Sequence, residues 1–332
     1  MKKIKFLEDF IMPCVDMPLE KLKEYNGRNP RPADFDEYWD ESLAEMNAID
    51  PSVELKPYDL PSCVVDFFEL TFTSTKGARI YAKLARPKNL VGKAPAILRF
   101  HGLSGDGGDW SSLVRYAAEG FVIASMDCRG QGGKSIDVGG TVGTTHSTQF
   151  ARGLDGDPKD LHCRELFLDT AMLARIVMGL DYVDESRVGV MGGSQGGALT
   201  VACAALVPSI SLCAPVYPYL SDYKRVFEMD LNKGAYEGLR YYFRHFDPTH
   251  AREDEIFTKL GYIDIQFLAP RIKAKVLMAT GLMDTTCPPS TQFAMYNKIT
   301  SEKQVVIYPD YGHEGLKGHD DIVFRFMAQL LD

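Results

Sequence analysis

A serine, an aspartate and a histidine stand where a nucleophile and its two activating partners are expected. Residues 192–196 match the pattern G-x-S-x-G around Ser194, directly after an apolar, strand-like run and directly before an Ala-rich helical stretch. Such a strand-to-helix turn raises the serine hydroxyl above a sheet, and its glycines remove side chains that would clash there. A glycine-rich turn whose serine merely caps the helix is the alternative. The flanking strand and helix favour the nucleophile.

A serine hydroxyl needs a base that is itself oriented by a carboxylate. Asp284 follows an apolar run at 275–280, and His313 follows a second apolar run at 304–309. Serine, acid and histidine in this chain order, with each partner in a loop after a later strand, are typical of serine α/β-hydrolases. We therefore predict Ser194, Asp284 and His313 as the catalytic residues.

Three other residues compete for the acid and base roles. His319 comes where the last helix is expected to begin, and Asp310 belongs to the loop that must present the histidine. Asp222 follows a strand that ends near residue 216, a position that some hydrolases use for the acid. Asp284 is preferred because its loop is short and flanked by glycine. The remaining histidines are expected to be structural or to line the substrate site: His101, His146, His162, His245 and His250.

An ester carbonyl attacked by serine also needs two N–H donors for its developing negative charge. The backbone N–H of Gln195, directly after the nucleophile, is the first candidate. The second is the N–H of Leu103, in the Gly-rich segment that follows an apolar run at 96–100. Phosphate binding by this segment is disfavoured, because it lacks both the P-loop lysine and the G-x-G-x-x-G spacing.

Neither a metal site nor a cofactor is expected. The sequence has no H-E-x-x-H helix and no Cys/His cluster with ligand spacing. Its cysteines are odd in number, widely spaced and without a C-x-x-C pair, which is typical of reduced thiols in a cytoplasmic protein: Cys14, Cys63, Cys128, Cys163, Cys203, Cys213 and Cys287. Cys287 stands three residues after Asp284 and could lie near the pocket, although a packed small residue is the preferred interpretation.

Charge and hydrophobicity limit the classes of partner. The chain has 332 residues, of which 37 are basic and 45 acidic, so its formal net charge is −8. Nucleic acids and anionic membranes bind cationic faces, so neither is an expected partner, although a local basic patch is not excluded. The basic start of the chain lacks the apolar stretch of a signal peptide, since Glu8 and Asp9 interrupt it. No window approaches the ~18 apolar residues of a membrane span.

Short apolar runs alternate with helix-length segments from residue 95 onward. This alternation predicts an α/β fold with a mostly parallel central sheet and helices on both faces, in a single domain spanning 1–332. Residues 1–60 are expected to form an N-terminal arm with a helix over 33–49, and residues 64–85 a β-hairpin. Residues 218–262 lack a buried strand and are expected to form a helical insertion over the sheet edge.

Several segments together resemble carbohydrate esterase family 7, the acetyl xylan esterase and cephalosporin C deacetylase group. The segments that carry the resemblance are RGQ at 129–131, RGL at 152–154, GSQGG at 193–197, GLMDTTCPPST at 281–291 and HE at 313–314, with DMPLEKLKEY and RPADFDEYW near the start. The resemblance runs over nearly the whole chain. It implies an α/β-hydrolase without a cofactor that removes acetyl groups from small esters, including acetylated xylo-oligosaccharides and cephalosporin C.

The resemblance also implies a catalytic triad at Ser194, Asp284 and His313 and a hexamer built as a trimer of dimers around an internal cavity. One position departs from the family pattern. Bacillus-type members have a tyrosine after His-Gly where this chain has Leu103, so a phenol hydrogen bond is lost and acyl or sugar preference could differ. Other readings are a dienelactone-hydrolase-like or peptidase-like hydrolase, or a non-catalytic scaffold with the hydrolase fold.

Overall fold

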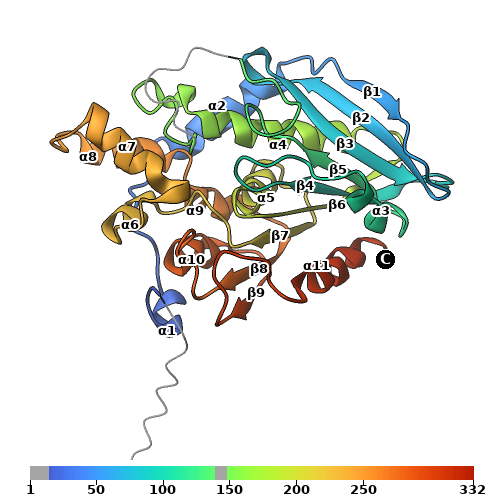
Figure 1. Ribbon diagram of the computed structural model, residues 1–332. Helices are drawn as coiled ribbons and strands as arrows, with labels where there is room; N and C mark the ends of the chain where they lie inside the picture. The colour runs from blue at the N-terminus through green and yellow to red at the C-terminus, as the bar shows by residue number, and fades with distance from the viewer. Residues whose placement is uncertain (1–14, 139–147) are drawn as a thin grey trace, which may run out of the picture.

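The strands of the protein form one twisted central sheet (Figure 1). A computed structural model describes residues 15–138 and 148–332, so Cys14 and His146 lie outside the described residues. Within these ranges the sheet has nine strands. Their order across the sheet is β1 (Glu54–Tyr58), β2 (Val65–Thr73), β3 (Arg79–Pro87), β5 (Val122–Met126), β4 (Ala94–Phe100), β6 (Val183–Gly193), β7 (Leu212–Val216), β8 (Lys275–Gly281) and β9 (Lys303–Tyr308).

Six strands form the parallel part that the alternating pattern predicts. Strands β4 to β9 pair in parallel, whereas β1, β2 and β3 extend the sheet antiparallel from β5. The β2–β3 hairpin turns through residues 75–77, as expected. Strand β1 was not anticipated within the 1–60 arm. It is an edge strand whose side chains are mostly exposed, so its sequence carries no buried apolar pattern.

Helices cover both faces of the sheet, which confirms the predicted α/β class. Strand residues alternate between two apolar clusters: Leu98 and Val190 pack with α4 and α5, while Ile97 packs with α3 and α11 on the opposite face (Figure 1). The helices are α1 (Leu19–Leu22), α2 (Phe35–Asn47), α3 (Ser111–Ala117), α4 (His162–Met178), α5 (Gln195–Leu206), α6 (Tyr223–Glu228), α7 (Glu237–Phe246), α8 (Glu253–Gly261), α9 (Ile265–Leu268), α10 (Pro289–Lys298) and α11 (His319–Met327). Within the described ranges, we find none with the length and apolar character needed to cross a bilayer.

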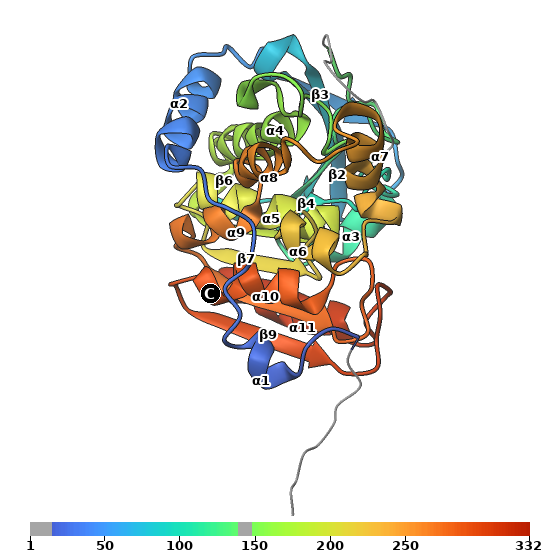
Figure 2. The ribbon, with the colours of Figure 1, turned by 90° about the vertical axis from the view of Figure 1, so that its left-hand side faces the viewer.

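The predicted insertion is helical. It follows β7, an interior strand, and contains α6, α7 and α8 (Figure 2). Its apolar residues join the cluster that contains α4 and α5, and Trp39 of α2 donates a hydrogen bond to the carbonyl of Tyr262 at 3.0 Å. Most of the aromatic residues of this segment are therefore buried against the body of the protein, whereas Tyr241 is exposed.

Strands β4 and β6 are neighbours, although β5 separates them in the chain. Phe100 pairs with Gly192 at the carboxyl ends of the two strands. The chain leaves β4 toward β5 on one side, while β6 lies on the other, so the strand order reverses here. Ligands of open α/β sheets bind beyond the carboxyl ends of the strands at such a point. The loops after β4 and β6 therefore meet where a site is expected.

Candidate active site

Ser194 occupies a sharp turn between β6 and α5. Its backbone has φ 58° and ψ −120°, a conformation that costs a non-glycine residue free energy and persists only where the surroundings enforce it. The Ser194 N–H donates to the carbonyl of Val216 at 3.0 Å. A Cβ on Gly196 would lie 2.1 Å from the Phe100 carbonyl oxygen, so only glycine lets α5 approach β4 this closely. The G-x-S-x-G spacing is thus a packing requirement of this turn.

The three residues predicted as catalytic lie within direct hydrogen-bonding distance. His313 Nε2 is 2.9 Å from Ser194 Oγ, and His313 Nδ1 is 2.8 Å from Asp284 Oδ2. A carboxylate accepts the proton of Nδ1, which leaves Nε2 as the acceptor for the serine hydroxyl. This is the arrangement in which a histidine can remove a serine proton.

The loop after β8 holds Asp284 in a fixed orientation. The carboxylate is fully buried, and its Oδ1 accepts the backbone N–H groups of Thr286 and Cys287, both at 2.8 Å. Because Oδ1 is occupied in this way, Oδ2 faces His313. The 281–291 segment that carries part of the family resemblance therefore orients the acid.

The two predicted oxyanion donors belong to loops that contact each other. As the first residue of α5, Gln195 has an N–H without a partner inside the helix. Leu103 lies in a turn closed by a 3.1 Å bond from the Gly105 N–H to the Gly102 carbonyl. A Cβ on Gly102 would be 3.9 Å from the Gly193 carbonyl oxygen, so this turn passes directly beside the nucleophile.

Gln131 connects these two loops, a role that sequence reasoning missed. Its Oε1 accepts the N–H of Ser104 at 2.8 Å, next to Leu103. Its side-chain amide is also hydrogen-bonded to the amide of Gln195 at 3.0 Å. Gln131 is the last residue of the RGQ segment, whose place in the resemblance gave the only signal that this glutamine matters.

The other polar residues of this region fix the loops after β4 and β5. Arg129 forms a bidentate pair with Asp169 on α4, at 2.7 and 2.6 Å. Burial lowers the pKa of His101, so its ring is neutral at pH 7. Its Nε2 accepts the Cys128 N–H at 2.9 Å, and its Nδ1 donates to the Gly102 carbonyl at 2.7 Å. His101 is thus structural, as expected.

Tyr217 packs on the imidazole of His313 and was not identified from the sequence. The two ring centroids are 4.6 Å apart with the planes tilted by 53°. Tyr217 has φ 31°, unusual for an aromatic residue, and its N–H donates to the Ala279 carbonyl at 2.8 Å. The tyrosine ring therefore limits how the histidine can rotate.

The competing acids and bases have other surroundings. Asp222 is buried, but its partners are Tyr25 and two backbone N–H groups of residues 28 and 29. Asp310 is exposed. His319 is the first residue of α11, and its Nδ1 lies 3.3 Å from the Tyr308 hydroxyl. His245 and His250 are exposed on the insertion, and His162 is buried beside Asp137.

One group of side chains, among those described, combines three types of metal ligand. Ligand atoms of Asp284, Cys287 and His313 lie within 4.8 Å of one another. Both ring nitrogens of His313 already serve the aspartate and the serine, and burial raises the pKa of the Cys287 thiol. The group is better described as the hydrogen-bonded triad with a neutral thiol beside it. Cys287 is fully buried, so the expected packed residue lies next to the triad.

Comparison with known proteins identifies the family. The acetyl xylan esterase (AXE1) family model matches residues 12–330. The acetyl esterase Axe7A of Xylanibacter ruminicola is 29% identical over 305 residues, which cover 89% of this chain and 65% of that protein. The chain thus spans just under two thirds of this curated relative.

Two solved structures are similar over almost their whole length. Acetyl xylan esterase 1 of Thermoanaerobacterium sp. JW/SL YS485 superposes with a TM-score of 0.94 at 54% identity, covering 96% of this chain and all of the other. An acetyl xylan esterase of Paenibacillus sp. R4 gives 0.88 at 33% identity, covering 94% and 99%. A protein described as a dienelactone hydrolase from Klebsiella pneumoniae, at 18% identity and a TM-score of 0.52, shares the fold alone. The chain belongs to the acetyl xylan esterase family, carboxylic-ester hydrolases with the α/β-hydrolase fold.

Proposed function

We propose that this protein is a serine acetyl esterase that removes acetyl groups from small acetylated carbohydrates such as xylo-oligosaccharides. The observation that carries the proposal is the continuous hydrogen-bond path from Asp284 through His313 to Ser194 Oγ. The similar structures are acetyl xylan esterases. Cephalosporin C, whose acetyl group is also a small ester, is a second proposed substrate.

In the proposed mechanism, His313 Nε2 takes the Ser194 proton as the hydroxyl oxygen attacks the acetyl carbonyl. Asp284 holds the imidazole in the required tautomer and stabilises the cation that forms. The N–H groups of Gln195 and Leu103 donate to the oxyanion of the tetrahedral intermediate. The intermediate expels the sugar oxygen, which takes a proton from His313 and leaves as a hydroxyl group.

Water then attacks the acetyl group on Ser194, with His313 again acting as the base. The second tetrahedral intermediate releases acetic acid, which ionises to acetate, and His313 returns its proton to the serine oxygen. Each preorganised N–H donor contributes about 10²–10³ in rate in enzymes of this type. Gln131 supports the reaction by keeping the loops of both donors together.

Leu103 is proposed to affect which acyl groups and sugars the enzyme prefers. Its backbone supplies the donor, whereas its aliphatic side chain cannot supply the phenol hydrogen bond of family members with tyrosine at this place. We expect short acyl groups to be preferred. A preference for butyrate or longer esters would contradict the proposal.

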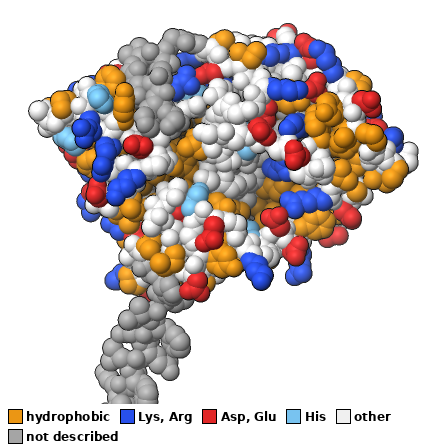
Figure 3. Space-filling view, in the orientation of Figure 1, with side chains coloured by type: hydrophobic (Ala, Val, Ile, Leu, Met, Phe, Trp, Pro, Cys, Tyr) orange, Lys and Arg blue, Asp and Glu red, His pale blue; other side chains and the backbone are white. Residues whose placement is uncertain are grey.

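The proposed assembly is a hexamer, and the proposed location is the cytoplasm. Apolar side chains are exposed on and beside the edge strand β1, at Val53, Tyr58 and Val64, which are 42, 37 and 48% exposed. Edge strands and apolar surface favour contacts with another chain. The six described cysteines are all free thiols, which suits a reducing compartment. On the face in Figure 3, acidic and basic side chains are intermixed, which suits a neutral sugar ester as substrate.

The direct test compares Ser194→Ala with Ser209→Ala, a control at an exposed serine. We expect the first variant to lose nearly all hydrolysis of p-nitrophenyl acetate and all labelling by a fluorophosphonate probe, and the second to keep both. Full turnover by the Ser194→Ala protein would refute the proposed nucleophile. A folded wild-type protein that the probe does not label would favour the non-catalytic scaffold. Acetylated xylo-oligosaccharides and cephalosporin C, assayed together, identify the substrate.

A further inference from the structure

A cavity of about 250 Å³ adjoins the triad on the face of the sheet that α3 and α11 cover. We refer to it as the α3–α11 cavity. Its base is formed by the ends of β6 and β7, including Gly193 and Val216, and its walls include Arg115 of α3 and His319 of α11. Tyr217, whose ring contacts His313, forms the wall toward the catalytic centre.

Arg99 brings a positive charge without a carboxylate partner to this cavity. It lies on β4, where its Nε donates to Ser125 Oγ at 3.0 Å and its Nη2 to the Gly107 carbonyl at 2.6 Å. Among the described residues, no Asp or Glu oxygen lies within the 4.0 Å of an ion pair with this guanidinium. Burial, with the nearby positive charge of Arg115 as second cause, lowers the pKa of Arg99.

The remaining charges of the cavity leave that positive charge uncompensated. Arg115 Nη1 pairs with Asp320 Oδ2 at 3.1 Å, so these two residues cancel each other. His319 is only 3% exposed, and burial lowers its pKa, so its ring is neutral. The lining therefore has a net charge of about +1, which matches one carboxylate.

His319 adds a buried polar atom that lacks a partner. Its Nδ1 lies 3.3 Å from the Tyr308 hydroxyl, which can donate to it. In that tautomer Nε2 carries the proton, and Nε2 has no hydrogen-bond partner within the described part of the chain. Because His319 lines the cavity, this N–H is available to a polar group bound there.

We propose that the α3–α11 cavity binds a small carboxylate, and that its ligand is the acetate released by the esterase. Beyond the bonds to Ser125 and Gly107, Arg99 keeps N–H groups on Nη1 and Nη2, which can bind a carboxylate through two parallel N–H···O bonds. The Nε2–H of His319 offers a third donor. The cavity is smaller than the 300–1,000 Å³ typical of sites for drug-sized ligands, so it suits an ion of a few atoms. This inference rests on the proposed acetyl esterase activity only for the source of the acetate.

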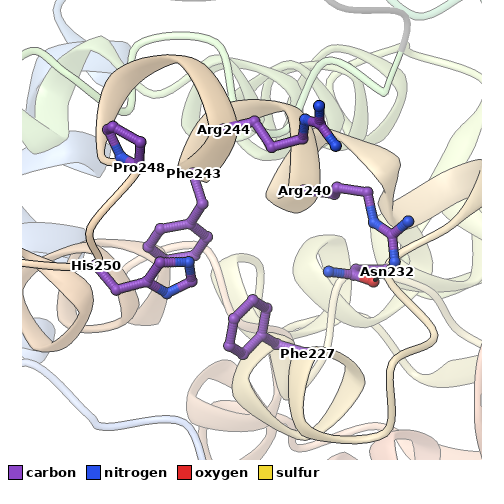
Figure 4. A pocket seen from close by; sticks show the side chains of 7 residues that line it. All are labelled: Phe227, Asn232, Arg240, Phe243, Arg244, Pro248 and His250. Carbon is purple, nitrogen blue, oxygen red and sulfur yellow. Dashed lines mark hydrogen bonds between the residues drawn. The ribbon is translucent and has the colours of Figure 1, made fainter.

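Two other cavities are less suited to an anion. One of about 470 Å³ shares Arg99 but is also lined by Asp106 and Asp109, which repel a carboxylate. The other, of about 400 Å³, lies on the insertion, where Arg240 and Arg244 extend from α7 and Asn232 lies beside Arg240 (Figure 4). Arg240 already pairs with Asp230 at 3.0 Å, and Arg244 is exposed to water. Arg244 therefore provides a matched control for Arg99.

Acetate binding is measured directly, by calorimetry or ligand-observed NMR, on the whole chain carrying Ser194→Ala, so that no turnover is needed. For so small a ligand we expect a Kd of about 1–10 mM. Adding Arg99→Gln should weaken acetate binding at least about tenfold (1.4 kcal/mol), whereas adding Arg244→Gln should leave it unchanged. Acetamide, a neutral analogue, should not bind, and chloride at equal ionic strength should not compete.

In the active enzyme, acetate should inhibit hydrolysis of p-nitrophenyl acetate, and Arg99→Gln should relieve that inhibition. Arg99 also donates to the Gly107 carbonyl in the loop after β4, so Arg99→Gln could weaken acetate binding by disturbing that loop. Two further variants distinguish this effect from the loss of a ligand contact. Arg99→Lys should retain acetate binding, and His319→Phe should weaken it. The inference would be overturned if Ser194→Ala proteins with and without Arg99→Gln bound acetate with equal affinity. It would also be overturned if no binding were detected at about 100 mM acetate. Either result leaves the esterase proposal intact, since labelling of Ser194 tests that separately.

Discussion

Asp284 and Asp222 follow neighbouring strands, β8 and β7, and both side chains are fully buried. Each accepts two backbone N–H groups on Oδ1. The two carboxylates differ at Oδ2. That of Asp284 lies 2.8 Å from His313 Nδ1, whereas that of Asp222 accepts the Tyr25 hydroxyl at 2.8 Å. Burial and a position after a strand are therefore not sufficient to assign a catalytic acid.

The hydrogen-bond donors to each carboxylate indicate its role. Those of Asp284 come from its own loop and from a histidine that reaches the nucleophile. Those of Asp222 all come from residues 25–29, so this carboxylate fastens the N-terminal segment to the start of the insertion. One aspartate orients a reacting group, whereas the other joins two distant parts of the chain. Substitutions should separate these roles.

The largest effect is expected from Asp284→Asn. An amide in place of the carboxylate favours the wrong tautomer of His313, which costs about 10⁴ in kcat in the serine protease triad. The melting temperature should change little, because the amide oxygen can still accept the N–H groups of residues 286 and 287. Steady-state kinetics with p-nitrophenyl acetate measure the loss, with Asp310→Asn as an exposed control. A loss of less than tenfold would place the acid elsewhere.

Asp222→Ala should instead lower stability by about 2–3 kcal/mol, because it leaves one buried and two part-buried donors without an acceptor. Asp222→Asn is the matched control. It keeps the amide oxygen for two of the donors and tolerates the left-handed backbone at this position, φ 50°. Urea unfolding gives the difference, and kcat of the folded protein should stay within about threefold of wild type. A large loss of kcat at unchanged stability would reverse the two roles.

The roles of the two aspartates could not be predicted equally well from the sequence. Asp284 could be predicted, since chain order, a short loop and the preceding apolar run all point to it. Asp222 could be identified only as a rival, because its partners lie 193 to 197 residues away in the chain. No local pattern encodes contacts at that separation. Strand β1 was missed for a related reason, since its exposed side chains need not alternate.

Asp264 shows how strongly Asp222 affects its surroundings. It is fully buried and accepts the N–H of Asp222 at 2.9 Å. Burial, with the nearby charge of Asp222 as second cause, raises the pKa of Asp264 to about 8. Lys298 lies beside both, linked to Asp264 through the amide of Gln266. At neutral pH the folded protein therefore holds a proton on Asp264.

This proton gives a pH dependence whose sign follows from linkage. Between a pKa near 3.9 in the unfolded chain and about 8 in the folded protein, only the folded state binds the proton, so stability falls as pH rises. The Asp264→Asn variant lacks this titrating group, so its stability should not change with pH in this way. The difference in stability, variant minus wild type, should therefore rise by about 2 kcal/mol from pH 6 to pH 8. Urea unfolding at several pH values measures it. A constant difference would mean that Asp264 is ionised throughout this range.

The smallest effect is expected on the catalytic side, at Gln131. The RGQ segment marked this residue, but only the folded structure brings residues 104, 131 and 195 together, so its role could not be read from spacing. Gln131→Ala removes the bonds that join the loops of the two oxyanion donors. Small displacements of catalytic groups reduce rate without abolishing it. We expect kcat to fall about tenfold with little change in KM, because the donors act mainly on the transition state.

Gln329→Ala, at an exposed glutamine on the last turn, serves as the control and should leave kcat unchanged. The profile of kcat against pH separates positioning from acid–base chemistry. If Gln131 acts only by holding the two loops, the Gln131→Ala profile keeps its shape and falls uniformly, because His313 and Asp284 are untouched. A shifted profile would mean that Gln131 also acts on the triad, and an unchanged kcat would mean that the loops hold each other without it. A uniform fall would show that Asp284 and Gln131 have different roles. Asp284 is required for the proton transfer itself, whereas Gln131 only aligns the donors that stabilise the oxyanion.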